Sequence, residues 1–308
     1  MKKLNLLIIG VGRMGETHLS LYKKIDKNLN LFVYDNNTNL CQKIADKYNI
    51  TYLRDFNEAK NINIDICDIC LPNHLHFDYI KRAIKLNTHI IVEKPVVISD
   101  KEWQLLSSYL NNYKKVFMCA YVERYFQPYL LVKKFLEENN AKILNFSFTR
   151  WGNNLESGSW LLDTNKSGGV LMDLGIHDVD FLCSIIDTIS KIDLLSFNKK
   201  DQYSELLLNI NNSIIGSISA GWNIPKNDVN NFYNSFTILT DRGIIKYDSI
   251  TKDLYINDKK NNIKKERYPD AYSKELKVFI QKIFSRKINN KDELNIITKT
   301  MFLLNKIK

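Results

Sequence analysis

The sequence predicts an α/β protein with two domains, the first built on a parallel sheet and the second an α+β domain with an open, mainly antiparallel sheet. Two observations predict this division. Up to about residue 121, short apolar runs alternate with stretches of helical periodicity, and beyond it strand-like runs follow one another closely. The length of 308 residues suits two domains, which we expect at 1–121 and 122–308.

The first half alternates brief apolar runs with helical spacing. Each run is bounded by polar or turn-forming residues, as strands are, and the stretches between carry apolar residues at intervals of three and four. This alternation is typical of βαβ units in a parallel sheet. The expected strands are 4–9, 29–35, 65–71, 88–93 and 115–121, and the expected helices are 14–26, 38–48, 76–86 and 100–111.

The second half begins with an aromatic-rich helical stretch at 121–138, and a further helix is expected at 173–186. Turn-forming residues, such as the Asn-Asn pair at 211–212, separate the strand-like runs that follow, which favours antiparallel pairing. Helical spacing returns around 273–284, and we expect the last helices to pack on the first domain. The expected strands are 188–197, 203–210, 213–222, 232–240, 243–248 and 252–256.

The composition excludes several classes of protein. The chain carries 44 Lys and Arg against 34 Asp and Glu, a formal net charge of +10, but the basic residues are scattered, as in the segment 259–267. We therefore expect no nucleic-acid partner, and the alternative to a plain solvated surface is an attraction for anionic substrates. No run of about 18 apolar residues is present, and the five cysteines lack the spacing of a disulfide framework. These features favour a cytoplasmic protein without a membrane span.

The segment "GVGRMG" at 10–15 follows the first expected strand and opens the first expected helix. Its GxGxxG spacing is that of a Rossmann dinucleotide-binding turn, in which Gly10 permits the tight turn, Gly12 lets the backbone approach a pyrophosphate and Gly15 allows close helix packing. A glycine-rich turn with a structural role is the alternative. The position between a strand and a helix favours dinucleotide binding.

Asp35 ends the second expected strand, twenty residues beyond Gly15. A carboxylate at this place accepts hydrogen bonds from the adenosine ribose hydroxyls, and its charge repels a 2′-phosphate. The nearby Arg13 acts in the opposite sense on a 2′-phosphate. We therefore expect NAD as the cofactor, with NADP as the alternative.

Two further segments belong to the same end of the expected sheet. Ligands of an open parallel sheet lie outside the carboxyl ends of its strands. By this rule, two segments belong to the ligand-binding edge: "LPNHLH" at 71–76, after the strand at 65–71, and "EKP" at 93–95, after the strand at 88–93. It places Lys94 at the rim of the expected cofactor site.

Candidates for the chemistry come from both halves of the chain. Hydride transfer between an alcohol carbon and a nicotinamide requires a group that accepts the hydroxyl proton. In "SGGVLMDLGIHDVDFL" at 167–182, Asp173 and His177 lie four residues apart, so on one helix they share a face and the carboxylate can orient the imidazole. Lys94 is a candidate for holding or polarising the substrate oxygen. Each alone suits an ordinary structural role, but together with the glycine turn they indicate catalysis.

The motifs "GVGRMG", "PNHLH", "EKP" and "GGVLMDLGIHDVD" stand in the order of the glucose-fructose oxidoreductase / inositol dehydrogenase (Gfo/Idh/MocA) family, and at about its spacing. The sequence closely resembles this family over nearly its whole length, although it is shorter than many members. The resemblance implies an N-terminal Rossmann domain, an NAD(P)-dependent oxidoreductase, and a C-terminal domain whose open sheet often mediates dimers or tetramers.

When the functional residues of the family are matched to this sequence one by one, the resemblance implies a role for each motif. Lys94 is the lysine of the EKP motif, which positions substrate and cofactor, while Asp173 and His177 match the catalytic acid and the histidine that accepts the proton of the alcohol. It also implies that Pro72, Asn73 and Glu93 contact the nicotinamide half of the cofactor, and that His76 belongs to the loop on the cofactor side. The cofactor-binding residues expected from all of these observations are Gly10, Gly12, Arg13, Met14, Gly15, Asp35, Leu71, Pro72, Asn73, His76, Glu93 and Lys94.

Aromatic and guanidinium groups suit sugars and phosphates, so Arg124, Trp151 and Trp160 are expected to line a substrate pocket, with core or interface packing as the alternative. His74 and His76 lack a third ligand at a suitable spacing, so no metal is expected.

The sequence therefore predicts hydride transfer between a nicotinamide and a secondary hydroxyl or keto carbon of a sugar, sugar nucleotide or cyclic polyol, by a homodimer or homotetramer. One alternative is a reductase of another carbonyl or of an imine in secondary metabolism. Another is a dinucleotide-binding sensor without turnover. The presence of all three candidate catalytic side chains favours an enzyme.

Overall fold

The computed structural model divides the chain into two compact units. Unit 1 comprises Met1–Val97, Lys101–Ala120 and Tyr272–Asn295, and unit 2 comprises Ile98–Asp100, Tyr121–Ala271 and Ile296–Lys308. The structure describes residues 3–200, 202–224, 232–257, 259–261, 270–285 and 287–306, so most of the basic segment 259–267 lies outside the described residues. Within these ranges, no helix combines the length and the apolar character that crossing a bilayer requires.

Unit 1 is built on a six-stranded parallel sheet with the strand order β3-β2-β1-β4-β5-β6. The order reverses between β1 and β4, which is where a Rossmann sheet binds its ligand. The five predicted strands are present, and the two-residue β3 is additional. The strands are β1 (Leu4–Ile9), β2 (Leu29–Tyr34), β3 (Thr51–Tyr52), β4 (Ile66–Ile69), β5 (His89–Glu93) and β6 (Phe117–Ala120).

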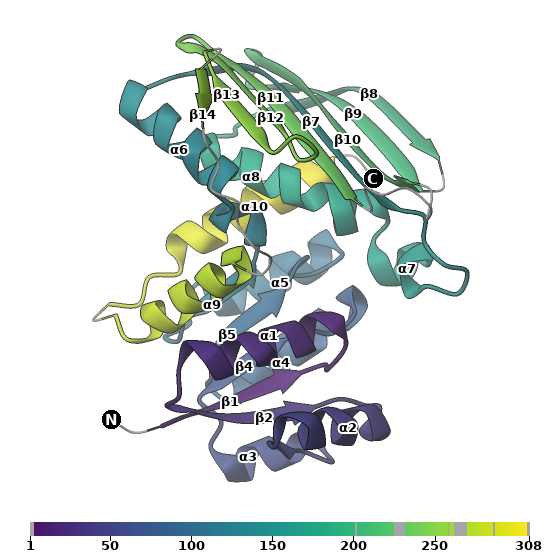
Figure 1. The fold of residues 1–308 in the computed structure, drawn as a ribbon, viewed down its shortest axis with the longest axis vertical. Coiled ribbons are helices and arrows are strands. Elements are labelled where there is room, and N and C mark those ends of the chain that lie inside the picture. Colours follow the sequence, from purple (N-terminus) through teal and green to yellow (C-terminus); the bar gives the residue numbers. More distant parts are fainter. Residues whose placement is uncertain are drawn as a thin grey trace. The chain divides into compact units, whose positions relative to one another are not determined.

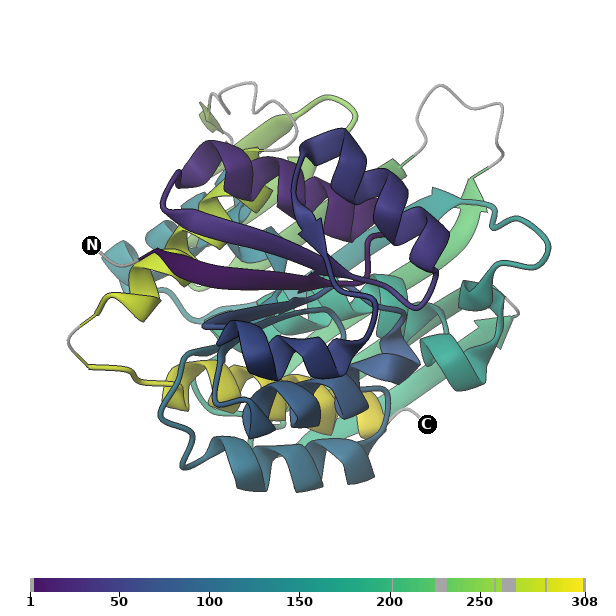
Figure 2. The same ribbon diagram turned by 90° about the horizontal axis from the view of Figure 1, so that it is seen from below.

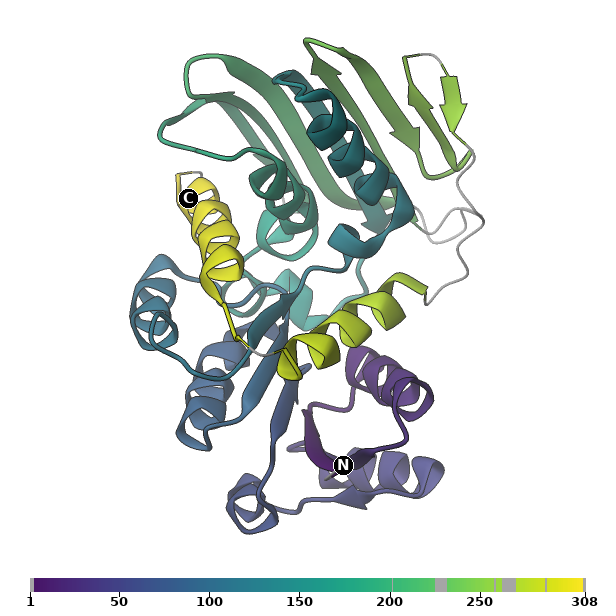
Figure 3. The same cartoon turned by 90° about the vertical axis from the view of Figure 1, so that its left-hand side faces the viewer.

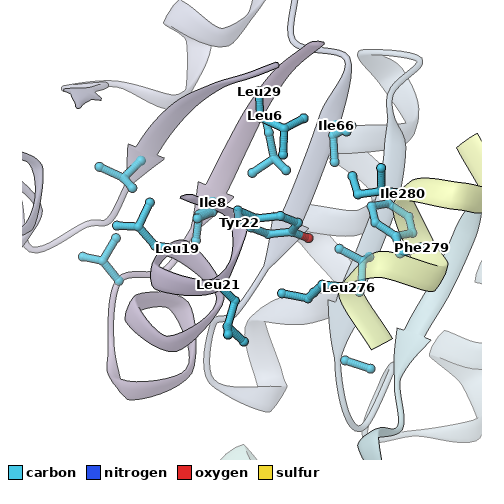
Figure 4. Close-up of a cluster of buried hydrophobic side chains, with 14 of the residues drawn as sticks. Leu6, Ile8, Leu19, Leu21, Tyr22, Leu29, Ile66, Leu276, Phe279 and Ile280 are labelled. Carbon is cyan, nitrogen blue, oxygen red and sulfur yellow. The ribbon is translucent and has the colours of Figure 1, made fainter. Parts of the chain in front are cut away.

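Helices cover both faces of this parallel sheet (Figure 2), because alternate side chains of a strand point to opposite faces. One face packs on α1, α2 and the late helix α9, where Leu276 and Phe279 lie close to Tyr22 of α1 (Figure 4). The helices that lie in unit 1 for all or most of their length are α1 (Arg13–Ile25), α2 (Thr38–Tyr48), α3 (Ala59–Ile62), α4 (His76–Lys85), α5 (Asp100–Leu110) and α9 (Asp270–Ile283).

Unit 2 is built on an eight-stranded sheet with the strand order β14-β13-β12-β11-β7-β10-β9-β8. Its pairs are antiparallel except for β7 with β10, so the sheet is mainly antiparallel, as predicted. The strands are β7 (Ile143–Asn153), β8 (Ile192–Lys200), β9 (Tyr203–Ile210), β10 (Ile214–Ile224), β11 (Phe232–Thr240), β12 (Gly243–Asp248), β13 (Asp253–Ile256) and β14 (Lys259–Asn261).

One face of this sheet is covered by helices (Figures 1 and 3). Phe181 of α8 packs against Phe148 of β7 and against Tyr129 of α6, with ring centroids 6.3 and 4.6 Å away. The helices that lie in unit 2 for all or most of their length are α6 (Gln127–Asn139), α7 (Thr164–Ser167), α8 (Ile176–Ile185) and α10 (Lys291–Asn305).

β7 is the main element that sequence periodicity misses, although it pairs with both β10 and β11 in the middle of the sheet. Its inward-facing positions include Phe146, Phe148 and Arg150, all buried. A charged residue at an inward position interrupts the apolar alternation by which a strand is recognised.

The side chain of Arg150 is buried, with 1% exposure, and lies at the centre of an ion network. Its Nε and Nη2 donate to the two carboxylate oxygens of Asp178 at 2.9 and 2.8 Å, Nη1 donates to Glu123, and Nη2 also donates to the hydroxyl of Tyr129 at 2.8 Å. Burial opposes the charged form, but Asp178 and Glu123 outweigh it and raise the pKa of Arg150 well above its usual range. The network ties β7 to α8.

Arg150→Met should lower the free energy of unfolding by about 3–5 kcal/mol, because it leaves two buried carboxylates without their cation. Urea unfolding followed by circular dichroism measures this loss. Lys133→Met is the control, since Lys133 makes an exposed ion pair with Glu137 at 3.8 Å and should contribute less than about 1 kcal/mol. Equal, small losses in both variants would show that the buried network does not stabilise unit 2.

Candidate functional site

The turn between β1 and α1 leaves room for a ligand at one of its three glycines. A Cβ on Gly15 would lie 1.9 Å from the carbonyl oxygen of Gly10, and Gly10 itself has a φ of +91°, so both positions require glycine. A Cβ on Gly12, in contrast, would meet no atom within 4 Å. The backbone at Gly12 therefore borders open space, as approach of a pyrophosphate requires.

The first turn of α1 presents positive charge at this place. The helix begins at Arg13, its N-cap Gly12 provides no side-chain hydrogen bond, and the side chain of Arg13 is exposed. The N–H groups of the first turn and the helix dipole attract anions. Met14 lies in the same turn and is partly buried. The turn therefore fits the pyrophosphate of a dinucleotide.

Asp35 lies directly after β2 and is joined to the glycine turn. Its Oδ2 accepts a hydrogen bond from the N–H of Val11 at 2.9 Å, and its Oδ1 accepts one from the N–H of Asn37 at 2.8 Å. Each carboxylate oxygen has two lone pairs, so both can accept a further hydrogen bond. This arrangement suits a ribose diol at the edge of the turn.

The loops after β4 and β5 leave neighbouring strands at the same edge of the sheet and are joined by His76. Its Nδ1 lies 2.6 Å from the carbonyl oxygen of Pro95, and its Nε2 lies 2.7 Å from that of Leu71. Burial lowers the pKa of His76 to about 4, so at physiological pH the neutral ring has one N–H and donates to one of the two carbonyl oxygens. The ring therefore contacts both loops but is hydrogen-bonded to one of them.

Lys94 is partly exposed at the end of β5, and its peptide bond to Pro95 is cis. The buried Glu93 accepts a hydrogen bond from the N–H of Lys94 at 3.2 Å. Pro72 and Asn73 lie in the loop after β4, where Asn73 is buried at the start of a single 3₁₀ turn. Unit 1 thus brings all twelve predicted cofactor-binding residues to the carboxyl ends of β1, β2, β4 and β5.

Asp173 and His177 lie at the start of the helix that covers the second sheet. Asp173 is buried in a π-helical turn, Leu171–Gly175, and the partly exposed His177 lies in the first turn of α8. The pair therefore spans the junction between the π turn and α8, and the expected contact between the two side chains stays a prediction. Single π turns often occur at functional sites.

Two aspartates that the sequence motifs did not single out follow His177 in α8 and anchor this helix. Asp178 pairs with Arg150, as described above, and Asp180 accepts hydrogen bonds from Nε and Nη2 of Arg124 at 2.7 and 2.5 Å. Both aspartates are almost fully buried. Acidic residues inside the otherwise apolar segment "GIHDVDFL" were the signal available in the sequence.

The residues predicted to bind substrate are dispersed within unit 2. Arg124 pairs with Asp180 and lies 4.9 Å from the ring centroid of Tyr121. Trp151 follows the inward-facing Arg150, so it points to the opposite face of the sheet from α8. Trp160 lies in the 3₁₀ turn Trp160–Leu162 and is partly exposed. We therefore leave Trp151 out of the proposed site.

Lys94 belongs to unit 1, whereas Asp173 and His177 belong to unit 2. Their convergence on one substrate stays a prediction.

A parallel sheet of this strand order, with an open glycine turn and an acidic residue after β2, defines a dinucleotide-binding protein. Residues 4–121 match the model described as "Oxidoreductase family, NAD-binding Rossmann fold", and residues 134–246 match the model of the "GFO/IDH/MocA C-terminal domain". The chain belongs to the Gfo/Idh/MocA oxidoreductase family, and its first domain is an NAD-binding Rossmann fold. The predicted family and fold class are confirmed.

Individual relatives are distant in sequence and close in fold. Levoglucosan dehydrogenase of Pseudarthrobacter phenanthrenivorans is 26% identical over 62% of this chain and 53% of its own length. The structure of UDP-N-acetylglucosamine 3-dehydrogenase GnnA from Acidithiobacillus ferrooxidans aligns with a TM-score of 0.81 at 17% identity, covering 100% of this chain and 98% of that one. A levoglucosan dehydrogenase in complex with NADH and L-sorbose aligns with a TM-score of 0.78 at 19% identity, covering 98% and 97%.

The sequence matches to curated relatives are partial. The chain spans between half and three fifths of the length of two curated relatives, the levoglucosan enzyme and D-glucoside 3-dehydrogenase of Escherichia coli. The solved structures, below 25% identity, support the fold.

Gly12→Ala and Gly15→Ala should separate ligand binding from folding. Gly12→Ala should weaken NADH binding by tenfold or more, about 1.4 kcal/mol, because the added methyl group occupies the space left for the pyrophosphate, with little change in melting temperature. Gly15→Ala should lower the melting temperature, because its methyl group overlaps the Gly10 carbonyl. NADH fluorescence and thermal unfolding measure the two effects. A Gly12→Ala variant with unchanged NADH affinity would contradict the placement of the pyrophosphate.

Proposed function

We propose that this protein is an NAD-dependent oxidoreductase that transfers a hydride between the nicotinamide and a secondary hydroxyl or keto carbon of a sugar, sugar nucleotide or cyclic polyol. The observation that carries the proposal is the open glycine turn at Gly12, with Asp35 beside it and Lys94 at the same edge of the sheet. The names of relatives that act on levoglucosan and on UDP-N-acetylglucosamine support a sugar-like substrate. The net charge of +10 is compatible with an anionic sugar nucleotide.

The proposed mechanism gives each side chain a separate task. NAD, when bound, supplies the hydride acceptor. His177 receives the proton of the substrate hydroxyl, Asp173 orients the imidazole, and the ammonium group of Lys94 holds the reacting oxygen. The partial exposure of His177 and Lys94 leaves both groups accessible to a small molecule. No metal takes part in this mechanism.

A second proposal concerns the choice between the two nicotinamide dinucleotides. The carboxylate of Asp35 lies at the glycine turn, where it accepts the hydrogen bond of Val11. It suits the two ribose hydroxyls of NAD and repels the 2′-phosphate of NADP, so we favour NAD.

A sensor without turnover, or a reductase of another carbonyl or imine, remains the alternative function. A sensor has a use for the glycine turn and Asp35, but none for the combination of Lys94, Asp173 and His177. The buried carboxylate of Asp173 in the π turn and the partly exposed imidazole of His177 in the first turn of α8 are therefore the features that favour an enzyme.

We also propose that the open face of the eight-stranded sheet joins two copies of this chain. Neighbouring strands place Ile244, Leu239, Asn145 and Ile215 in one row across this face, and Leu207 lies in the next. All four apolar members of this set are exposed, in contrast to the polar outer face of a sheet that meets water. The small side chains of Ser147 and Ser217 lie in the same row as Leu207 and allow a second sheet to approach.

We also propose that the protein is located in the reducing environment of the cytoplasm. All five cysteines are free thiols in the structure, four of them buried. Unpaired cysteines are usual in compartments that keep thiols reduced.

Lys94→Ala and His177→Ala should each lower turnover of a responsive sugar substrate by about 10²–10⁴-fold while NADH binding is retained. The reason is that each removes a group acting on the substrate oxygen and leaves the glycine turn intact. Steady-state kinetics over a panel of sugars and sugar nucleotides, with NADH fluorescence, provides the measurement. Lys101→Ala, at an exposed position of α5, is the control. NADH binding by the wild type without turnover of any substrate would favour the sensor.

Ile215→Arg should shift the protein toward the monomer, raising the dissociation constant of the assembly by at least tenfold, about 1.4 kcal/mol. A symmetric interface contains the substitution twice, so two buried charges face an apolar surface. Light scattering coupled to size-exclusion chromatography reports the mass. Leu105→Arg on α5 is the matched control, since Leu105 is 46% exposed and Ile215 is 47% exposed. A mass that is unaffected by Ile215→Arg would rule out this face.

A further inference from the structure

A chain of buried polar side chains runs from Asp68 of β4, through His18 of α1, to Glu93 at the end of β5 within unit 1. Nδ1 of His18 lies 2.9 Å from Oδ2 of Asp68, and Nε2 of the same ring lies 3.4 Å from Oε1 of Glu93. His18 and Asp68 are fully buried, and Glu93 is 9% exposed. Nδ1 is hydrogen-bonded to Asp68, whereas Nε2 makes no hydrogen bond within the described residues and lies at ion-pair distance from Glu93. Two carboxylates around one ring favour the doubly protonated imidazole.

The surrounding charges keep the ring of His18 protonated. Burial by itself lowers the pKa of His18, but Asp68, Glu93 and Glu275 of α9 outweigh it and raise that pKa to about 9. The folded pKa therefore lies above the ordinary value of 6.5. The ion pair contributes its full stabilisation below pH 6.5 and loses it as the pH rises through about 9.

Glu93 connects this chain to Lys94. One of its carboxylate oxygens faces His18, and the other accepts a hydrogen bond from the N–H of Lys94 at 3.2 Å. Burial raises the pKa of Glu93, His18 and Lys94 oppose that rise, and Asp68 adds to it. Loss of the imidazolium would therefore let Glu93 take up a proton at a higher pH, and the acceptor that holds the Lys94 peptide would become weaker.

The same place has a donor set that suits a metal ion, since ligand atoms of His18, Asp68 and Cys70 lie within 4.8 Å of one another. A metal would require Cys70 as the thiolate and His18 as the neutral ring. Burial instead raises the pKa of Cys70 well above its usual range, and the hydroxyl of the neighbouring Tyr22 is kept neutral in the same way. Nδ1 of His18 is also hydrogen-bonded to Asp68. These observations favour a chain of polar side chains over a metal site.

We propose that His18 and Asp68 are positioning residues for the reaction, because through Glu93 they fix the backbone of Lys94 and so the place of its ammonium group. This inference rests on the proposed function of Lys94 and extends the site to two residues that the sequence motifs do not include.

Asp68→Asn and His18→Gln test the proposal in the full-length protein. Asp68→Asn is nearly isosteric and removes one carboxylate, and His18→Gln removes the imidazolium. His89→Gln is the matched control, because His89 is a buried histidine at the opposite end of β5, where its Nδ1 accepts a hydrogen bond from Val116 at 3.0 Å. The measurements are kcat and KM across pH, NADH affinity, melting temperature, and the titration of His18 by NMR of histidine-labelled protein.

Both test variants should lose about 10- to 100-fold in kcat at neutral pH, with NADH affinity nearly unchanged, because the reacting oxygen is held less precisely. In His18→Gln the loss should partly reverse as the pH rises and Glu93 ionises. His89→Gln should keep its kcat and lose only stability. In the NMR titration, His18 of the wild type should change near pH 9, and Asp68→Asn should lower that midpoint.

Several results would overturn the proposal. They are an unchanged kcat in both test variants, an equal loss of kcat in His89→Gln, and a loss in His18→Gln that does not respond to pH. A stoichiometric metal in the purified wild type that disappears in Cys70→Ser would replace the hydrogen-bonded chain by a metal site. If the variants do not fold, the NMR titration of the wild type still tests the proposal. A His18 that titrates near its ordinary pKa of 6.5 would contradict the proposed ion pair. Wild-type protein that binds NADH but turns over no substrate contradicts the proposed function instead, and the NMR titration then tests the ion pair alone.

Discussion

An ionised side chain that folding removes from water must meet an opposite charge or give up its own, because the cost of burying an isolated charge exceeds the stability of a whole domain. Among the described residues, each unit contains a buried set of three charged side chains that meets this requirement. In unit 1, His18 lies between Asp68 and Glu93, and in unit 2, Arg150 lies between Asp178 and Glu123. Each set of charges comes from a helix or turn and from a strand, so pairing them specifies how that element lies on its sheet.

The residues proposed for the chemistry are chain neighbours of these pairs. Lys94 directly follows Glu93, and His177 directly precedes Asp178. A backbone that is held by a buried ion pair has little freedom at the next residue, which is what a group that must meet a reacting atom requires. The dinucleotide is bound differently, since the glycine turn offers it backbone N–H groups and space. Binding by the backbone is therefore a property of the parallel sheet of unit 1, whereas positioning by buried charge is found in both units.

Much of the fold follows from local patterns. The strands and helices of unit 1 agree closely with the predicted ranges, because each βαβ unit carries its own periodicity and its own turn signals. The place of Gly12, Asp35 and Lys94 at one edge follows from the rule for ligands of parallel sheets. β7 was missed because Arg150 occupies a position where a strand pattern requires an apolar side chain. The π turn that contains Asp173 was missed because the bonding of a single turn depends on what it packs against, here Ala220 of β10.

The sequence by itself determined the class of fold, the family, and the motifs of the dinucleotide site, since these depend on periodicity and on spacing along the chain. Only the tertiary structure decided that Arg124 and Arg150 serve as partners of Asp180 and Asp178, and that Trp151 points away from α8. It also decided that His18, Asp68 and Glu93 form one chain. His18 and Asp68 are 50 residues apart in the sequence, so folding alone brings them together. The protonation state and the mobility of a side chain depend on its neighbours in space, and the residues next to it in the sequence do not determine those neighbours.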